Sequence, residues 1–367
     1  MRATGKRIRA LGQRTKGTRA LGMKRRMGVA LGIVAALAAV AFVVYRWRTS
    51  GFSWQAFADS LRNVDWSWLG VALVLISATY FGRALRWEVM LRPVAKKASL
   101  MGILSATCIG FTAVVLFGRA GEPVRPYLIA RREGVSFSSQ IAAWVVERIL
   151  DLLMVLVIFG IALTQVSHSG IRSSPRMEVT LQAGGAAAGI AGLACLALLV
   201  GLRQFKGNVQ KRLIEGLSFL PVPMLGRIQT FFTAFGEGMQ STRRSAFAFL
   251  LVGYTILEWT VITGCFYCVF RAFPATAHLG FTDIVIVLGF VSFGSILQIP
   301  GVGGGMQIVT IVVLTQFYGV ALEAASGVAL MLWLISFVVV VPVGLGLAFQ
   351  EGIKWRSLKH IDSGAGT

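Results

Sequence analysis

Charged side chains stand inside long apolar segments of this 367-residue sequence, and three clusters of them have the spacing of ion pairs or anion sites. The first cluster holds Arg83, Arg86 and Glu88, and its two arginines are three residues apart, so they share one face of a helix. A charge in the middle of a bilayer costs about 2.5–3.5 kcal/mol, so such residues are usually paired and functional. The alternative is that Arg83 and Arg86 snorkel to the membrane surface, because the apolar segment ends at Leu91.

The second cluster is Gly-Arg-Ala-Gly-Glu-Pro-Val-Arg at residues 118–125. Glu122 and Arg125 are spaced to pair if a local helix forms, which leaves the guanidinium of Arg119 as a fork of donors suited to phosphate. Pro123 fits the first turn of a short helix, whose N-terminal amides also attract an anion. The alternative is an ordinary cytoplasmic loop.

The third cluster is Glu147, Arg148 and Asp151, one turn of charge in an otherwise apolar segment. Glu147 and Asp151 are four residues apart and share a helix face, so they repel each other unless a cation lies between them. Arg119 and Arg125 are the candidates for that cation. The alternative is a purely structural ion network. Glu258 also falls in an apolar segment, but the sequence offers it no partner.

Membrane-spanning helices must position these clusters. With 56% hydrophobic residues, 14% charged residues and a mean hydropathy of +0.73, a soluble protein of this length could not bury its apolar surface. Apolar runs of about twenty residues are long enough to cross a bilayer. Six such runs predict full spans at residues 27–45, 66–91, 138–163, 179–202, 245–270 and 323–349.

The basic residues fix the predicted orientation. The formal net charge is +21, and ten of the lysines and arginines precede Met27. Such a tail is an orientation signal and a contact for anionic lipid rather than a nucleic-acid site, and it makes the first span an uncleaved signal anchor. We therefore expect a basic cytoplasmic tail at 1–26, one transmembrane domain at 27–350 and a cytoplasmic tail at 351–367. An amphipathic segment at about 206–240 is expected to lie at the cytoplasmic interface.

Two further apolar regions are predicted to dip into the membrane and return. If residues 100–117 crossed alone, the later basic segments would be exported, so we expect a re-entrant pair with residues 123–132 as its returning limb. Residues 284–318 are broken by Pro300 and the glycines that follow, which predicts a second re-entrant loop entered from outside. The predicted fold is an all-α polytopic membrane protein with six full spans, two re-entrant helix pairs and an inverted repeat.

Other kinds of chemistry find little support in the sequence. Cys108, Cys195, Cys265 and Cys268 all fall in apolar segments, where packing is the favoured interpretation over metal or redox chemistry. The histidines are scattered, and no Gly-x-x-x-x-Gly-Lys-Ser/Thr phosphate loop occurs. We expect no cofactor, no metal and no nucleic-acid partner.

The three clusters, in this order, resemble the lysylphosphatidylglycerol synthase transmembrane-region family, also described as flippase-like integral membrane proteins. The matching features are Arg83-Ala-Leu-Arg-Trp87, the 118–125 sequence, Glu147-Arg148-x-x-Asp151 and the break at 300–305. Here Gln307 stands where the family has a glutamate, which puts any charged role there in doubt. The resemblance implies a membrane domain that moves or presents lipid headgroups. Larger members carry a soluble aminoacyl-transferase domain, and we do not expect its synthase activity in this chain.

These observations lead us to expect a lipid or glycolipid translocator of the bacterial cytoplasmic membrane. Arg119 and Arg125 are expected to contact the headgroup phosphate, while Glu122, Glu147 and Asp151 hold them in place. The expected headgroup site is Arg83, Arg86, Arg119, Glu122, Arg125, Glu147, Arg148 and Asp151, and the expected hinge is Pro300, Gly301, Gly303, Gly304, Gly305 and Gln307.

The alternatives are a membrane-embedded transferase that acts on lipid-linked sugars and a non-transporting scaffold for a partner lipid synthase. The expected partners are a membrane phospholipid or glycolipid, with a second copy of the chain or a lipid synthase as a further partner.

Overall fold

The computed structural model describes residues 51–92, 94–95, 98–168, 184–186, 188–195, 197, 229, 245–295, 298–299 and 303–352. Nearly all of them belong to the second of two compact units, Gln55–Thr367. The predictions for the 27–45 span, the 206–240 segment, most of both tails, Pro300 and Gly301 fall on residues outside this description.

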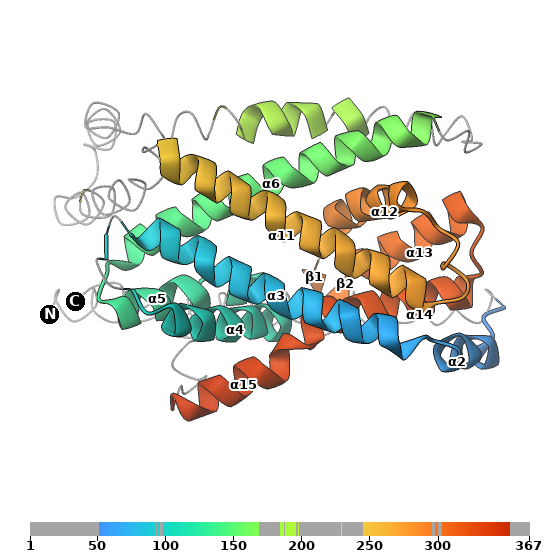
Figure 1. Cartoon of the computed structure of the whole chain (residues 1–367), viewed down its shortest axis with the longest axis horizontal. Coiled ribbons are helices and arrows are strands. Elements are labelled where there is room, and N and C mark those ends of the chain that lie inside the picture. The colour runs from blue at the N-terminus through green and yellow to red at the C-terminus, as the bar shows by residue number, and fades with distance from the viewer. Residues whose placement is uncertain are drawn as a thin grey trace, which may run out of the picture. The chain divides into compact units, whose positions relative to one another are not determined.

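Helices make up almost all of the described residues (Figure 1). In chain order they are α2 Trp54–Arg62, α3 Trp66–Leu91, α4 Leu100–Phe117, η1 Gly118–Gly121, α5 Val124–Glu133, α6 Phe137–His168, α11 Ser245–Ala272, α12 Phe281–Gly294, α13 Gly305–Tyr318, α14 Leu322–Trp333, η2 Leu334–Val338 and α15 Val340–Gln350. Two-residue strands, β1 (Gln298–Ile299) and β2 (Gly303–Gly304), pair antiparallel between α12 and α13.

Four helices among the described residues are long and apolar enough to cross a membrane: Trp66–Leu91, Leu100–Gly121, Phe247–Ala272 and Leu322–Gln350. At 32 residues α6 is longer than these, and it carries the third charge cluster. The prediction of an all-α polytopic membrane protein is therefore confirmed.

The first predicted re-entrant region is a helical hairpin. The backbone N–H of Ser99, which caps α4, donates to the Glu133 carboxylate at the end of α5, so both limbs end together. Arg132 donates to the Gly102 carbonyl at the same end. The turn through η1 is tight, because a Cβ on Gly121 would stand 2.3 Å from the Ala113 carbonyl oxygen. Residues 100–133 therefore go out and come back, as predicted.

The second predicted re-entrant region is also a helical hairpin, made by α12 and α13. The Tyr318 hydroxyl at the end of α13 lies 3.4 Å from the Asp283 carbonyl at the start of α12, so these limbs also end together. The tip holds the β1–β2 pair, and the residue before α13 is Gly304, which has φ +134°. The Gln307 side-chain oxygen accepts the Gly304 N–H at 2.7 Å, so this amide caps α13. A neutral side chain is sufficient for that role.

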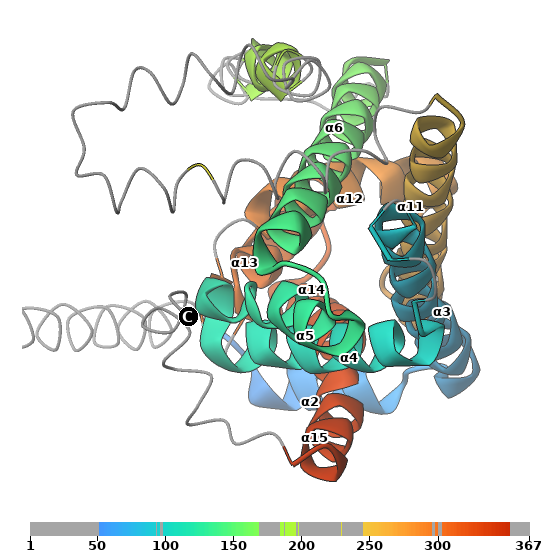
Figure 2. The same ribbon diagram turned by 90° about the vertical axis from the view of Figure 1, so that its left-hand side faces the viewer.

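The long helices and the hairpins form an inverted arrangement. α3 and α11 run antiparallel side by side (Figures 1 and 2), and the Asp65 N–H before α3 donates to the Ala272 carbonyl at the end of α11, at 2.9 Å. The α4–α5 hairpin starts from the C-terminal end of α3, and the α12–α13 hairpin from the C-terminal end of α11, which is the opposite end. Each hairpin packs on the last helix of the other half, α4 on α15 and α12 on α6. This arrangement agrees with the predicted inverted repeat.

Glycines permit both of these close helix contacts. A Cβ on Gly344 of α15 would lie 2.6 Å from the Cys108 carbonyl oxygen of α4, and one on Gly289 of α12 would lie 2.9 Å from the Ala162 Cβ of α6. A π segment, η2, lies between α14 and α15 and ends four residues before Pro342. Because proline has no N–H to donate, the helix cannot keep its regular hydrogen bonds there.

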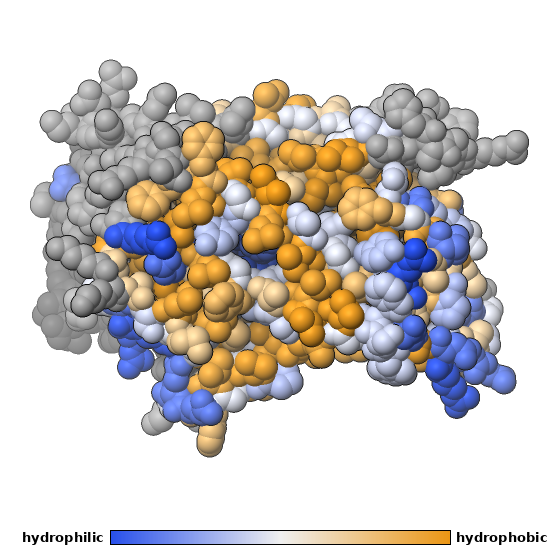
Figure 3. All heavy atoms as spheres, viewed as in Figure 1, coloured by the Kyte–Doolittle hydropathy of each residue, from blue (hydrophilic) through white to orange (hydrophobic). Residues whose placement is uncertain are grey.

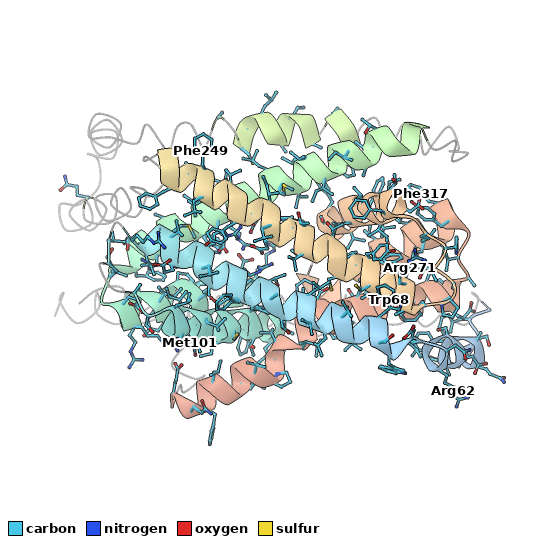
Figure 4. All side chains as sticks on the ribbon, in the orientation of Figure 1. Arg62, Trp68, Met101, Phe249, Arg271 and Phe317 are labelled. Carbon is cyan, nitrogen blue, oxygen red and sulfur yellow. The ribbon has the colours of Figure 1, made fainter. Side chains whose placement is uncertain are left out.

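The outer surface of the helices suits lipid. Figure 3 shows hydrophobic residues across the middle of the face that carries α3 and α11, with hydrophilic residues towards its two ends. Large apolar side chains such as Val74 and Phe249 are 68% and 78% exposed. Arg271 lies at the end of α11 near Trp68 (Figure 4), where it donates to the Tyr267 hydroxyl and the Ala277 carbonyl. Asp65 caps α3 by accepting two hydrogen bonds from Ser67, which lower the pKa of its carboxyl.

Candidate functional site

Arg86 is the centre of a buried ion network that joins α3, α6 and α11. Its side chain is fully buried, and its terminal nitrogens lie 2.6 Å from Glu147, 2.8 Å from Asp151 and 3.3 Å from Glu258. It also donates to the Thr255 hydroxyl at 3.1 Å. The interpretation that Arg86 snorkels to the surface is therefore wrong. Arg86 is also the cation between Glu147 and Asp151, a place for which the sequence suggested Arg119 or Arg125.

Arg125 reaches the same network from the returning limb of the first hairpin. Its Nη1 lies 3.0 Å from both oxygens of Glu147, and its Nη2 donates to the Arg83 carbonyl at 3.1 Å. The guanidinium stacks on Trp87 at 4.1 Å from the ring centroid, a favourable cation–π geometry. Gly110 of α4 allows this approach, because a Cβ there would stand 2.5 Å from the Arg125 Cβ.

The predicted Glu122–Arg125 pair does not form. Glu122 follows η1 and accepts from Arg119 at 3.0 Å instead. The reason is that Glu122 ends one helical segment whereas Arg125 begins the next and points between the helices, where it is 4% exposed. Pro123 occupies the N-cap position of α5, one residue before the first helical turn in which the sequence placed it. Glu88 faces away from its cluster and pairs with Arg92.

Arg83 and Glu258 form an ion pair between the two halves of the inverted arrangement. The Arg83 Nε lies 2.8 Å from a Glu258 oxygen, and the Arg83 guanidinium stacks over Phe111 at 4.5 Å. Arg83 donates no hydrogen bond from Nη1 or Nη2 to any described residue, and its side chain is 17% exposed. Both of its terminal nitrogens are therefore available to a ligand.

Arg148 extends the network along α6. Its Nη2 lies 3.1 Å from Asp151 and 3.6 Å from Glu147, while 40% of its side chain is exposed. Arg119, at the tip of the first hairpin, is 56% exposed. These two arginines and Arg83 are the accessible cations of the site.

These charged groups lie around one cavity of about 330 Å³. Charged residues of both halves line it: Arg83, Arg119, Glu122, Arg125, Glu147, Arg148, Asp151 and Glu258. Ser292, Ser295 and Met306 bring the second hairpin to the same cavity, and Ser336 and Phe337 bring the π segment. The tips of the hairpins meet, since β1 lies next to η1. The cavity thus lies between the two helical hairpins.

Sequence reasoning missed several members of this site. Glu258 had no partner within its own helix, yet its position in an apolar span was the available signal for a functional acid. Phe111 and Thr255 gave no signal, because their roles depend on contacts between helices, and Trp87 stood only as the last residue of a family motif. Gln307 is not among the residues that line the cavity.

These features define a multi-pass membrane protein with a charged cavity inside its helices. The family described as "Lysylphosphatidylglycerol synthase TM region" matches residues 29–344. The chain belongs to this family, so the resemblance found in the sequence is confirmed. Membership suggests a role connected with membrane lipids.

One curated relative is the "Glycosyltransferase AglD" of Haloferax volcanii, which is 27% identical over 111 residues. That similarity covers 30% of this chain and 18% of the length of the relative. No solved structure matches the chain.

Proposed function

We propose that this protein moves an anionic phospholipid or glycolipid headgroup across the bacterial cytoplasmic membrane, through the cavity between its two hairpins. The observation that carries the proposal is that one cavity holds the tips of both hairpins and the Arg83 guanidinium, whose two terminal nitrogens donate to no described residue. Opposed broken segments that meet at a polar site are typical of transporters. The family and its connection with membrane lipids support the same conclusion.

The headgroup is held by the accessible arginines. Arg83, Arg119 and Arg148 line the cavity with exposed donors, and arginine binds phosphate oxygens in a fork geometry. Arg125, which we expected to contact phosphate, already uses both terminal nitrogens within the protein. It therefore contributes charge and holds Glu147 in place.

The acyl chains stay in the membrane. Small-molecule sites commonly have volumes of about 300–1,000 Å³, so this cavity of about 330 Å³ is at the lower end of that range. That is enough for a phosphate with a small substituent and too little for two acyl chains. The break at 300–305 acts as the hinge, and both chain termini face the cytoplasm. Transport is driven by a gradient or by the supply of headgroups, because the sequence contains no phosphate-loop ATPase motif.

A lipid-scrambling assay tests the proposal. The full chain is reconstituted in liposomes that contain a fluorescent phosphatidylglycerol, and dithionite bleaches the label that reaches the outer leaflet. We expect Arg83→Gln and Arg148→Gln to slow bleaching of the inner pool at least about tenfold, since each removes a charge-assisted contact. Arg119→Ala is expected to slow it as well.

Arg92→Gln is the matched control, because Arg92 pairs with Glu88 at the end of α3 and does not line the cavity. Rates that are equal in wild type, Arg83→Gln, Arg148→Gln and protein-free liposomes contradict the proposal. Equal slowing by Arg92→Gln would remove the cavity from the mechanism.

The second candidate function is a membrane-embedded transferase that acts on lipid-linked sugars, and the similarity to a glycosyltransferase favours it. Among the described residues, no three His, Cys, Asp or Glu side chains gather as metal ligands do. Formation of a sugar-transfer product by purified protein from a lipid-linked donor supports this candidate. Scrambling without any product supports the translocator.

A further inference from the structure

The charged groups around the cavity do not sum to zero. The cavity-lining side chains and their ion-pair partners contribute five arginines, Arg83, Arg86, Arg119, Arg125 and Arg148, and four acids, Glu122, Glu147, Asp151 and Glu258. The cavity-lining residues of α12, α13 and η2 are uncharged. The described residues around the cavity therefore carry one positive charge in excess.

Each acid in this set has an arginine partner, so the excess is a property of the whole network. Glu122 pairs with Arg119, Glu258 with Arg83, and Asp151 with both Arg86 and Arg148. Glu147 pairs with both Arg86 and Arg125. An unbalanced charge among apolar helices is costly, so a bound ligand that removes it is strongly favoured.

We propose that the cavity selects a headgroup with a single negative charge, a phosphodiester, over a doubly charged phosphomonoester. This inference rests on the proposed function and names its substrate class. A phosphodiester brings the network and ligand to zero net charge. A phosphomonoester dianion reverses the excess and places its second charge near Glu147, Asp151 and Glu258.

The accessible donors are sufficient for one phosphate group but not for two. Arg83 and Arg148 come from α3 and α6 and line the same cavity, each with a guanidinium that is partly held by an acid. Among the described residues of the second hairpin, the polar side chains that line the cavity are Ser292 and Ser295, whose hydroxyls already donate to the Leu288 and Ser292 carbonyls. A further phosphate group would find no additional cation there.

Calorimetric titration of the purified full chain tests the inference with two short-chain lipids that share their acyl chains. Dihexanoyl phosphatidylglycerol is a phosphodiester, and dihexanoyl phosphatidic acid is a phosphomonoester whose second ionisation has a pKa near 6. At pH 8 we expect phosphatidylglycerol to bind at least about tenfold more tightly. At pH 5, where both lipids carry about one charge, the ratio falls below about threefold.

Equal affinities at pH 8, or a ratio that does not change between pH 8 and pH 5, overturn the inference. The ratio at each pH cancels those effects of pH on the protein that change both affinities by the same factor. A soluble analogue of the same headgroup, glycerophosphoglycerol, is titrated in parallel. Equal binding of this analogue and of the lipid would show a site for soluble phosphodiesters and overturn the lipid assignment.

A charge change in the network sharpens the test. Asp151→Asn raises the excess to two, so the preference for phosphatidylglycerol at pH 8 falls at least about fivefold. Glu88→Gln makes the same change of charge outside the cavity and leaves the ratio unaltered. If Asp151→Asn does not fold, the wild-type pH series decides the question alone.

The two proposals fail separately. Normal scrambling of phosphatidylglycerol together with equal binding of both lipids refutes the charge rule and leaves the translocator. Charge-selective binding without scrambling refutes the translocator and leaves a lipid-binding protein.

Discussion

The sharpest prediction about the fold concerns Gly344, because a second glycine two residues further along α15 provides a matched control. A Cβ at Gly344 would lie 2.1 Å from the Thr112 Oγ1 and 2.6 Å from the Cys108 carbonyl oxygen, whereas nothing lies within 4 Å of one at Gly346. The Thr112 side chain can rotate, but the Cys108 carbonyl is fixed in α4. To restore an ordinary contact of 3.4 Å, α15 must move away from α4 by about 0.8 Å.

The two alanine substitutions should therefore act in opposite directions. Overpacking of this kind costs about 1–3 kcal/mol, so Gly344→Ala should lower the apparent Tm by about 2–8 °C. In Gly346→Ala the new methyl group meets no atom, and alanine is favoured over glycine in a helix by up to about 1 kcal/mol. That variant should keep its Tm or raise it.

Thermal unfolding of both variants in the same detergent, followed by tryptophan fluorescence, measures the difference. A fixed scan rate is needed, because membrane proteins of this size often unfold irreversibly. Equal Tm values for the two variants would mean that α15 does not pack on α4 through Gly344, and the inverted arrangement would lose one of its two cross-contacts.

Three further predictions concern the same framework and the site. Gly289→Ala should lower the Tm because its Cβ would stand 2.9 Å from Ala162, whereas Gly253→Ala on α11, with nothing within 4 Å, should not. Arg86→Lys should lower the yield of folded protein in size-exclusion chromatography, because one ammonium cannot reach Glu147, Asp151 and Glu258 at once and breaking a buried pair costs about 3–5 kcal/mol. Gln307→Leu removes the cap of α13 and should lower the Tm by an amount equivalent to about 1 kcal/mol, while Gln307→Glu, which keeps the acceptor, should not.

The sequence alone predicted the long elements well. The bounds of α3 and α4 agree with the predicted 66–91 and 100–117 to the residue, because polar caps and breaks mark their ends. Ser99 caps α4 and Gly118 ends it, and charge placement then implied that the chain turns back. The prediction missed α2, whose nine residues are too short and too polar to stand out as a span.

The pairing of charges could not be predicted from the sequence. Local spacing suggested Glu122 with Arg125, but Arg125 pairs with Glu147 of the next helix. Arg86 reaches acids 61 and 65 positions later in the chain and a threonine 169 positions away. Helical periodicity orders side chains around one axis, and it carries no information about which faces of two helices meet.

The composition of the network argues for a ligand rather than for stability alone. Replacing a buried ion pair with well-packed apolar side chains is often neutral or stabilising, so a cluster that only held helices together would gain little from its charges. A structural network would also be expected to balance, and the described residues of this one include one arginine in excess. Arg83 and Arg148 of this network face the cavity with side chains that are 17% and 40% exposed, at the meeting point of two hairpins. A monoanion bound at that point accepts hydrogen bonds from these arginines and cancels the excess positive charge, and no described side chain does both.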